Sequence, residues 1–130
     1  KFVDEKKFDR VLVDVPCSGT GTLAKKPDIK WKKDLQEFKK LIPLQRALLD
    51  KAASLVKDEG IIVYSTCSIE NEENFENIKY FLEQHSEFTL INAENILPSD
   101  VIDENGCVQT FPHLHQMDGA FAAKLVKKTQ

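Results

Sequence analysis

The chain has 130 residues, 42% of them hydrophobic and 30% charged, which fits one globular domain with a buried core. Its three cysteines are too few for a disulfide scaffold. The sequence has no 18-residue apolar stretch, which excludes a membrane span, and no signal peptide, which favours the cytoplasm. The net charge of −3 is uneven: residues 25–46 hold eight basic and three acidic side chains, whereas residues 58–104 hold one basic and twelve acidic, so a nucleic-acid partner is not excluded.

The first half of the chain predicts two buried strands joined by helices. We expect a strand over Val11–Val15, a loop over 18–33, a helix over 34–41 and, after Pro43, a helix over 44–57 and a strand over 61–65. Pro43 separates the helices because proline removes a helical N–H, and Gly60 suits the left-handed position that ends the second one. The core candidates of that second helix are Leu44, Ala47, Leu48, Leu55 and Val56.

The second half predicts one more helix and three more strands. Asn71 can cap a helix over 72–84, and Glu72 and Glu73 suit its positive end. A strand over 88–91, a loop over 92–106 with a short helical turn, and strands over 107–111 and 120–126 follow. This order predicts the α/β class, with a mainly parallel sheet, helices on its faces and a C-terminal β-hairpin.

Two cysteines end the two strands of the first half. Cys17 closes Asp14-Val15-Pro16-Cys17, and Cys67 follows the strand over 61–65. Strands joined by one helical crossover are usually neighbours, so both thiols should open at the same edge of the sheet. Asp14 lies just below that edge and could protonate or hydrogen-bond a substrate there. Each cysteine could instead be a small buried hydrophobe, the interpretation that we favour for Cys107.

Other polar segments carry weaker signals. Residues Lys25–Lys33 form a basic loop that could contact phosphates or simply be solvated, and we expect Trp31 in it to pack. Gly19-Thr20-Gly21 lacks the lysine of a phosphate-binding loop and the third glycine of a dinucleotide site, which leaves a tight turn. The spacing of His113 and His115 matches no common zinc arrangement, so no metal site is expected.

Two motifs resemble those of a known enzyme family. The RNA cytosine-C5 methyltransferases of the Sun/Fmu and nucleolar-protein family carry an Asp-Ala-Pro-Cys-Ser-Gly-x-Gly motif, which is similar to Asp14-Val15-Pro16-Cys17-Ser18-Gly19-Thr20-Gly21. Their second cysteine motif, and the Glu-Glu-Asn after it, resemble Tyr64-Ser65-Thr66-Cys67-Ser68 and Asn71-Glu72-Glu73-Asn74. Residues 27–31, 44–45 and 118–121 also look like family landmarks, in the family's order. Lys26 and Ala120 depart from it, standing where arginine and phenylalanine are usual.

The resemblance implies a partial Rossmann-like methyltransferase fold and S-adenosylmethionine-dependent methylation of cytosine C5 in RNA, most simply bacterial 16S rRNA. It assigns the attack on cytosine C6 to Cys67, release of the product to Cys17, and a place beside the base's N3 edge to Asp14. Asp14 and Pro16 would contact the cofactor. RNA contacts are expected from Lys25, Lys26 and Lys30.

Family members also carry a glycine-rich loop and a ribose-binding acid on earlier strands, which this sequence lacks. We therefore expect residues 1–130 to form the C-terminal portion of one catalytic domain and to be inactive alone. The unpaired edge of the strand over Val11–Val15 would favour self-association. Two alternatives are a non-catalytic RNA-binding module that uses Lys25–Lys33, and a thiol redox protein, which the lack of a Cys-x-x-Cys motif disfavours.

Overall fold

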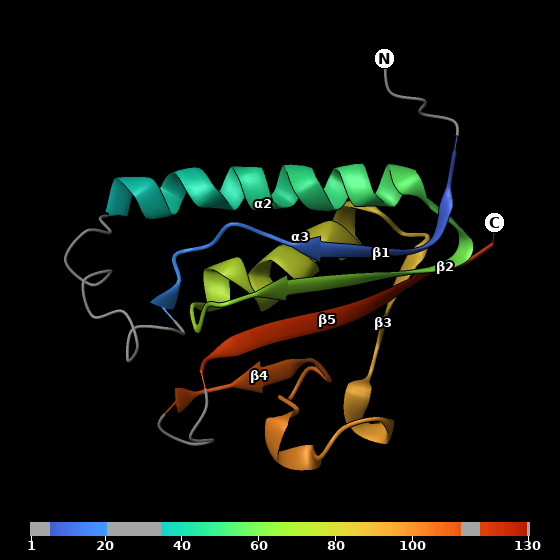
Figure 1. The fold of residues 1–130 in the computed structure, drawn as a ribbon. Coiled ribbons are helices and arrows are strands. Elements are labelled where there is room, and N and C mark those ends of the chain that lie inside the picture. Colours follow the sequence, from blue (N-terminus) through green and yellow to red (C-terminus); the bar gives the residue numbers. More distant parts are fainter. Residues whose placement is uncertain (1–5, 21–34, 113–117, 130) are drawn as a thin grey trace.

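The computed structural model describes residues 6–20, 35–112 and 118–129, in which one sheet carries both of the described α-helices on the same face (Figure 1). The elements, in chain order, are β1 (Phe8–Asp14), α2 (Leu35–Leu55), β2 (Val56–Thr66), a 3₁₀ turn (Asn71–Glu73), α3 (Phe75–Gln84), β3 (Phe88–Ile91), two further 3₁₀ turns (Ala93–Asn95 and Ser99–Val101), β4 (Val108–Thr110) and β5 (Ala120–Lys127). The predicted alternation of strands and helices is therefore confirmed.

The sheet is mixed. Its strand order is β1-β2-β5-β3, with β4 also pairing with β5. Strands β1 and β2 are parallel, whereas β5 runs antiparallel to β2, β3 and β4. The α/β class and the C-terminal hairpin of β4 and β5 are confirmed. The sheet is not mainly parallel, because β5 returns between β2 and β3.

Side chains on the sheet alternate between a covered and an open face. The row Val13, Tyr64 and Ala123 runs across β1, β2 and β5, and all three side chains are buried against the helices. The neighbouring row, Leu12, Val63 and Lys124, lies on the opposite face and lines a shallow groove there. Leu12 is 70% exposed, so the described residues leave an apolar patch beside the β1 edge.

Helix α2 runs unbroken through Pro43, where two helices were predicted. Lys39 and Pro43 both lie on its exposed side, where the carbonyl that loses its helical partner can be hydrated. Leu44 and Ala47 are exposed as well, so these two core assignments were wrong. The side that faces the sheet is formed by Gln45, Leu49, Ala52 and Ala53.

The start of β2 depends on two residues with different roles. Glu59, rather than Gly60, holds the positive φ angle, at 68°. A Cβ atom on Gly60 would lie 2.5 Å from Val56 Cγ2, 2.8 Å from the Lys57 carbonyl oxygen and 2.9 Å from the Asp9 carbonyl oxygen. Glycine is therefore required at position 60 by the close approach of the backbone of Lys57 and of Asp9 on β1, not by a left-handed turn.

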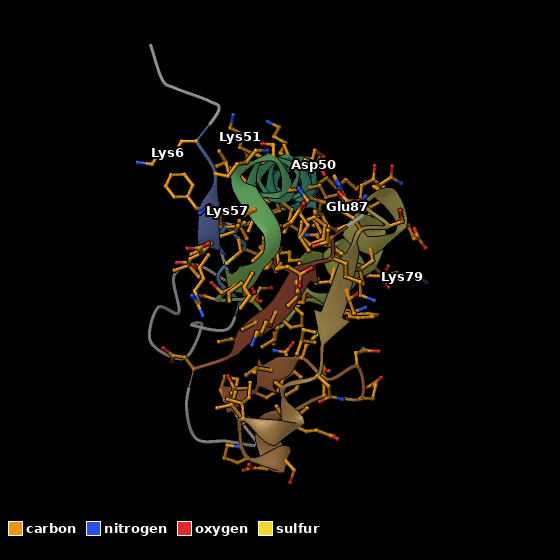
Figure 2. All side chains as sticks on the ribbon, turned by 90° about the vertical axis from the view of Figure 1, so that its right-hand side faces the viewer. Lys6, Asp50, Lys51, Lys57, Lys79 and Glu87 are labelled. Atoms are coloured by element: carbon orange, nitrogen blue, oxygen red, sulfur yellow. The ribbon has the colours of Figure 1, made fainter. Side chains whose placement is uncertain are left out.

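Helix α3 is anchored to α2 at its C-terminal end. The His85 ring stacks on Phe81, and its Nε2 lies 2.8 Å from Asp50 Oδ1 of α2. Glu87 approaches the other ring nitrogen at 3.7 Å, and Figure 2 labels both acids.

Neither α2 nor any other helix of the described chain is both long and apolar enough to cross a membrane.

Candidate active site

The carboxyl ends of β1 and β2 lie side by side because the two strands are parallel neighbours (Figure 1). Asp14 pairs with Ser65 in the register, and the Val15 N–H donates to the Ser65 carbonyl at 3.2 Å. Just beyond, the Cys67 N–H donates to Cys17 Sγ at 3.3 Å. The structure thus brings the two cysteine segments together at one edge of the sheet, as their strand positions predicted.

The three cysteines have different surroundings. Cys67 is exposed, Cys17 is half-buried and Cys107 is fully buried. Burial raises the pKa of the Cys17 thiol, and the negative charge of Glu73 adds to this increase, while two backbone N–H groups oppose it. Burial also raises the pKa of Cys107 to about 12, which agrees with its role as a small hydrophobe. An exposed and a half-buried thiol therefore share the edge of the sheet.

Asp14 and Pro16 lie at the same edge but on its outer side. Both are exposed, and Asp14 Oδ1 accepts a hydrogen bond from Ser65 Oγ at 2.9 Å. The Pro16 carbonyl accepts one from Gln45 Nε2 at 2.8 Å. An exposed carboxylate at the carboxyl end of a parallel strand is placed to accept hydrogen bonds from a ligand. Asp14 and Pro16 are therefore accessible to a ligand at this edge of the sheet.

A buried carboxylate, which the sequence did not reveal, joins the two cysteine segments. Glu73 is fully buried and accepts hydrogen bonds from Ser18 N–H at 2.7 Å and Ser18 Oγ at 2.6 Å. It also accepts from Ser68 Oγ at 2.5 Å and Gln45 Nε2 at 3.0 Å. The available signal was the pair of serines, each directly after a cysteine, with an acid five residues beyond the second.

A wider set of buried polar groups holds Glu73 in place through its main chain and through Gln45. Tyr64 donates its hydroxyl to the Glu73 carbonyl at 2.6 Å, and Asn77 Nδ2 donates to Gln45 Oε1 at 2.9 Å and to the Tyr64 oxygen at 3.0 Å. Every buried side-chain nitrogen and oxygen of the described residues has a hydrogen-bond partner. Such complete hydrogen bonding favours one defined arrangement of the cluster.

The start of α3 differs from the predicted cap. Asn74, not Asn71, occupies the N-cap position, and a 3₁₀ turn precedes it. Asn74 Oδ1 accepts from Thr66 Oγ1 at 2.7 Å, and its Nδ2 donates to the Ser68 carbonyl at 2.9 Å. The side chain thus holds the segment after β2 instead of capping the helix.

Several predicted residues lie outside the described part of the chain: Lys25, Lys26, Lys30, Trp31, His113 and His115. Within the described part, no three metal-binding side chains gather into a cluster that could hold a metal ion. Gly19 has a φ of 75°, a conformation that favours glycine, whereas Gly21 of the predicted tight turn lies outside the described residues.

Comparisons with known proteins agree on one family. The family model described as 16S rRNA methyltransferase RsmB/F matches residues 1–126. The chain is 41% identical over 121 residues to a protein named probable ribosomal RNA small subunit methyltransferase B from Synechocystis, covering 92% of this chain and 27% of the relative. It is 37% identical over 129 residues to ribosomal RNA small subunit methyltransferase B of Photorhabdus laumondii, covering 98% of the chain and 28% of the relative.

A solved structure shows the same fold. The crystal structure of NSun6 from Pyrococcus horikoshii with SFG superposes with a TM-score of 0.81 at 27% sequence identity, covering 97% of this chain and 32% of that one. The chain thus spans between about a quarter and a third of the length of these relatives.

Proposed function

Because the chain belongs to the RsmB/F family of 16S rRNA methyltransferases, we propose that it carries the thiol part of an active site that methylates C5 of cytosine in 16S rRNA. In this proposal residues 1–130 form the C-terminal portion of one catalytic domain. The observation that carries it is the pair of thiol segments at one edge of the sheet, with Cys67 exposed beside half-buried Cys17.

Cys67 performs the first step. Cytosine C5 is a poor nucleophile, but addition of the Cys67 thiolate to C6 opens the C5–C6 double bond and makes C5 enamine-like. C5 can then take up a methyl group. The exposure of Cys67 at the end of β2 suits attack on a large substrate, provided that the target base is unstacked to reach it.

Cys17 performs the release step. It takes the proton from C5 of the methylated ring, the electron pair of that C–H bond re-forms the C5–C6 double bond, and the bond between C6 and Cys67 Sγ breaks. Cys67 leaves as a thiolate. Burial raises the pKa of Cys17, so its thiol must first give up its proton to solvent, and the thiolate that forms is then a strong proton acceptor.

S-adenosylmethionine supplies the methyl group when bound. The SFG named in the structure of the Pyrococcus relative is an analogue of it, which supports this choice of cofactor. Asp14, oriented by Ser65 Oγ, lies beside the N3 edge of the base, and Asp14 and Pro16 form the wall of the cofactor site that this chain contributes.

The experiment that tests the two thiol roles uses the full-length protein, S-adenosylmethionine and two RNA substrates. Fluorine at C5 cannot be removed as a proton is, so RNA with 5-fluorocytidine at the target should trap a covalent adduct on the wild type but not on Cys67→Ala. On natural RNA, Cys17→Ala should accumulate the adduct. Cys107→Ala is the control, because it removes a cysteine that is buried in the core and has no part in the proposed steps, and it should behave as wild type. Adduct on Cys67→Ala would refute the assignment.

The lysines of residues 25–33 are proposed to bind the RNA backbone. Substituting Lys25 and Lys26 with alanine should weaken RNA binding and reduce the salt dependence of the affinity. Binding releases fewer counterions from the RNA when fewer phosphates are contacted. Lys51, exposed on α2, provides a control substitution. An unchanged salt slope would contradict this contact.

A further inference from the structure

The two serines that follow the two cysteines share one acceptor. Ser18 Oγ and Ser68 Oγ both donate to Glu73 Oε2, at 2.6 and 2.5 Å. The Ser18 N–H donates to Oε1 at 2.7 Å, so the carboxylate binds the backbone after Cys17 as well as both hydroxyls. One side chain thus connects the segment after β1 to the segment after β2, 50 residues apart.

Glu73 is itself held from two other elements, through its carboxylate and through its main-chain carbonyl. Gln45 of α2 donates to Glu73 Oε1 at 3.0 Å and to the Pro16 carbonyl at 2.8 Å, next to Cys17. Tyr64 of β2 donates to the Glu73 carbonyl at 2.6 Å. Burying a carboxylate is costly unless hydrogen bonds compensate it, and four donors converge on this one. Its position relative to both cysteine segments is therefore closely defined.

Resting on the two-cysteine function proposed above, we propose that Glu73 is a positioning residue for product release: it sets the spacing between Cys17 and Cys67. The two thiols act in sequence on adjacent ring atoms, C6 and then C5. Attack needs Cys67 alone, whereas release needs Cys17 to reach C5 while Cys67 is still bonded to C6. A displacement of the Cys17 segment therefore slows release more than attack, since small errors in the placement of reacting groups cost rate steeply.

The test compares Glu73→Ala and Glu73→Gln in the full-length protein, with Glu72→Ala as the matched control one residue earlier. Glu72 is exposed and bonds neither serine. We expect Glu73→Ala to form the 5-fluorocytidine adduct within about threefold of the wild-type rate, yet to accumulate adduct on natural RNA, with kcat lowered about tenfold or more and KM for RNA within about threefold. Glutamine keeps an acceptor oxygen for Ser18 N–H and Gln45, and its amide can donate to the rotated serine hydroxyls. Glu73→Gln should therefore restore kcat to within about threefold of wild type.

Three outcomes would overturn the inference. In the first, Glu73→Ala lowers the rates of attack and release equally, lowers the thermal stability as well, and accumulates no adduct. Another is Glu73→Ala behaving as Glu72→Ala does. If Glu73→Ala does not fold, Ser18→Ala is measured instead, and accumulation of adduct on natural RNA supports the inference while its absence overturns it. Failure of the proposed function gives a different result from failure of this inference alone. In that case the wild type itself forms no adduct with 5-fluorocytidine RNA, and both the function and this inference are contradicted.

Discussion

The chain has two tyrosines, and they allow the buried polar cluster to be tested one hydroxyl at a time. Tyr64 is fully buried, and its hydroxyl donates to the Glu73 carbonyl at 2.6 Å and accepts from Asn77 Nδ2 at 3.0 Å. Burial raises the pKa of Tyr64, so the hydroxyl stays a donor across the working pH range. Tyr80 on α3 is 38% exposed and contacts Arg46 through its ring, which makes Tyr80→Phe the control for Tyr64→Phe.

The expected cost follows from what remains after the hydroxyl is removed. The Glu73 carbonyl keeps a hydrogen bond from Asn77 Nδ2 at 3.2 Å, and Asn77 Nδ2 keeps its bond to Gln45 Oε1 at 2.9 Å. Neither partner is left alone, so Tyr64→Phe loses the net value of one to two hydrogen bonds, about 1–2 kcal/mol of unfolding free energy. Tyr80→Phe keeps the ring over which Arg46 lies, and should change that free energy by less than about 0.5 kcal/mol.

Urea unfolding followed by far-ultraviolet circular dichroism measures both changes, and the denaturant slope should be the same for all three proteins. Equal losses for the two variants would refute the argument, because burial and hydrogen bonding of the hydroxyl are what distinguish them. So would a loss below about 0.5 kcal/mol for Tyr64→Phe, which would mean that water replaces the cluster's bonds at no cost.

The negative charge of Glu73 adds to the effect of burial on the pKa of Cys17, so Glu73→Gln should lower that pKa. Alkylation of Cys17 by iodoacetamide should then begin at lower pH, as measured by mass spectrometry of the peptide that contains Cys17. Gly60→Ala places a methyl group 2.5 Å from Val56 Cγ2 and should cost about 1–3 kcal/mol of unfolding free energy in the same urea assay. We also expect self-association through the exposed sheet face that carries Leu12, beside the β1 edge. Leu12→Lys should shift sedimentation toward the monomer and change the unfolding free energy by less than about 0.5 kcal/mol.

Each of these expectations has a contrary result. An alkylation profile of Cys17 that moves to higher pH would reverse the sign of the Glu73 charge effect. Unchanged stability of Gly60→Ala would mean that Val56 and the backbone around position 60 can shift without cost. A wild-type protein that remains monomeric at high concentration would remove the basis of the Leu12 prediction.

The position of the two cysteines could be predicted because it depends on local pattern and one general rule. Apolar runs marked the two strands, and a single crossover between them placed the carboxyl ends of β1 and β2 together. The resemblance of the motifs to a known family added the cysteine roles, which remain predictions.

The burial of Glu73 could not be predicted in the same way. A glutamate is typically exposed, and the burial of this one depends on partners that include Ser18, 55 residues away. The same cluster explains the two wrong core assignments on α2. Gln45 turns inward to reach Glu73, which leaves Leu44 and Ala47 outside. Leu48 packs against the core and Val56 lies within it, as the hydrophobic spacing predicted.

The pairing of β5 has a consequence for the order in which this fold can be assembled. On the ribosome, β1, α2 and β2 can associate as soon as they emerge, since the parallel pair and its crossover helix are complete by residue 66. Strands β3 and β4 form their ladders with β5 alone among the described strands. The ladders of β3 and β4 therefore form only after residues 120–127 have been synthesised, which makes the last strand of the chain the one that joins both to β2.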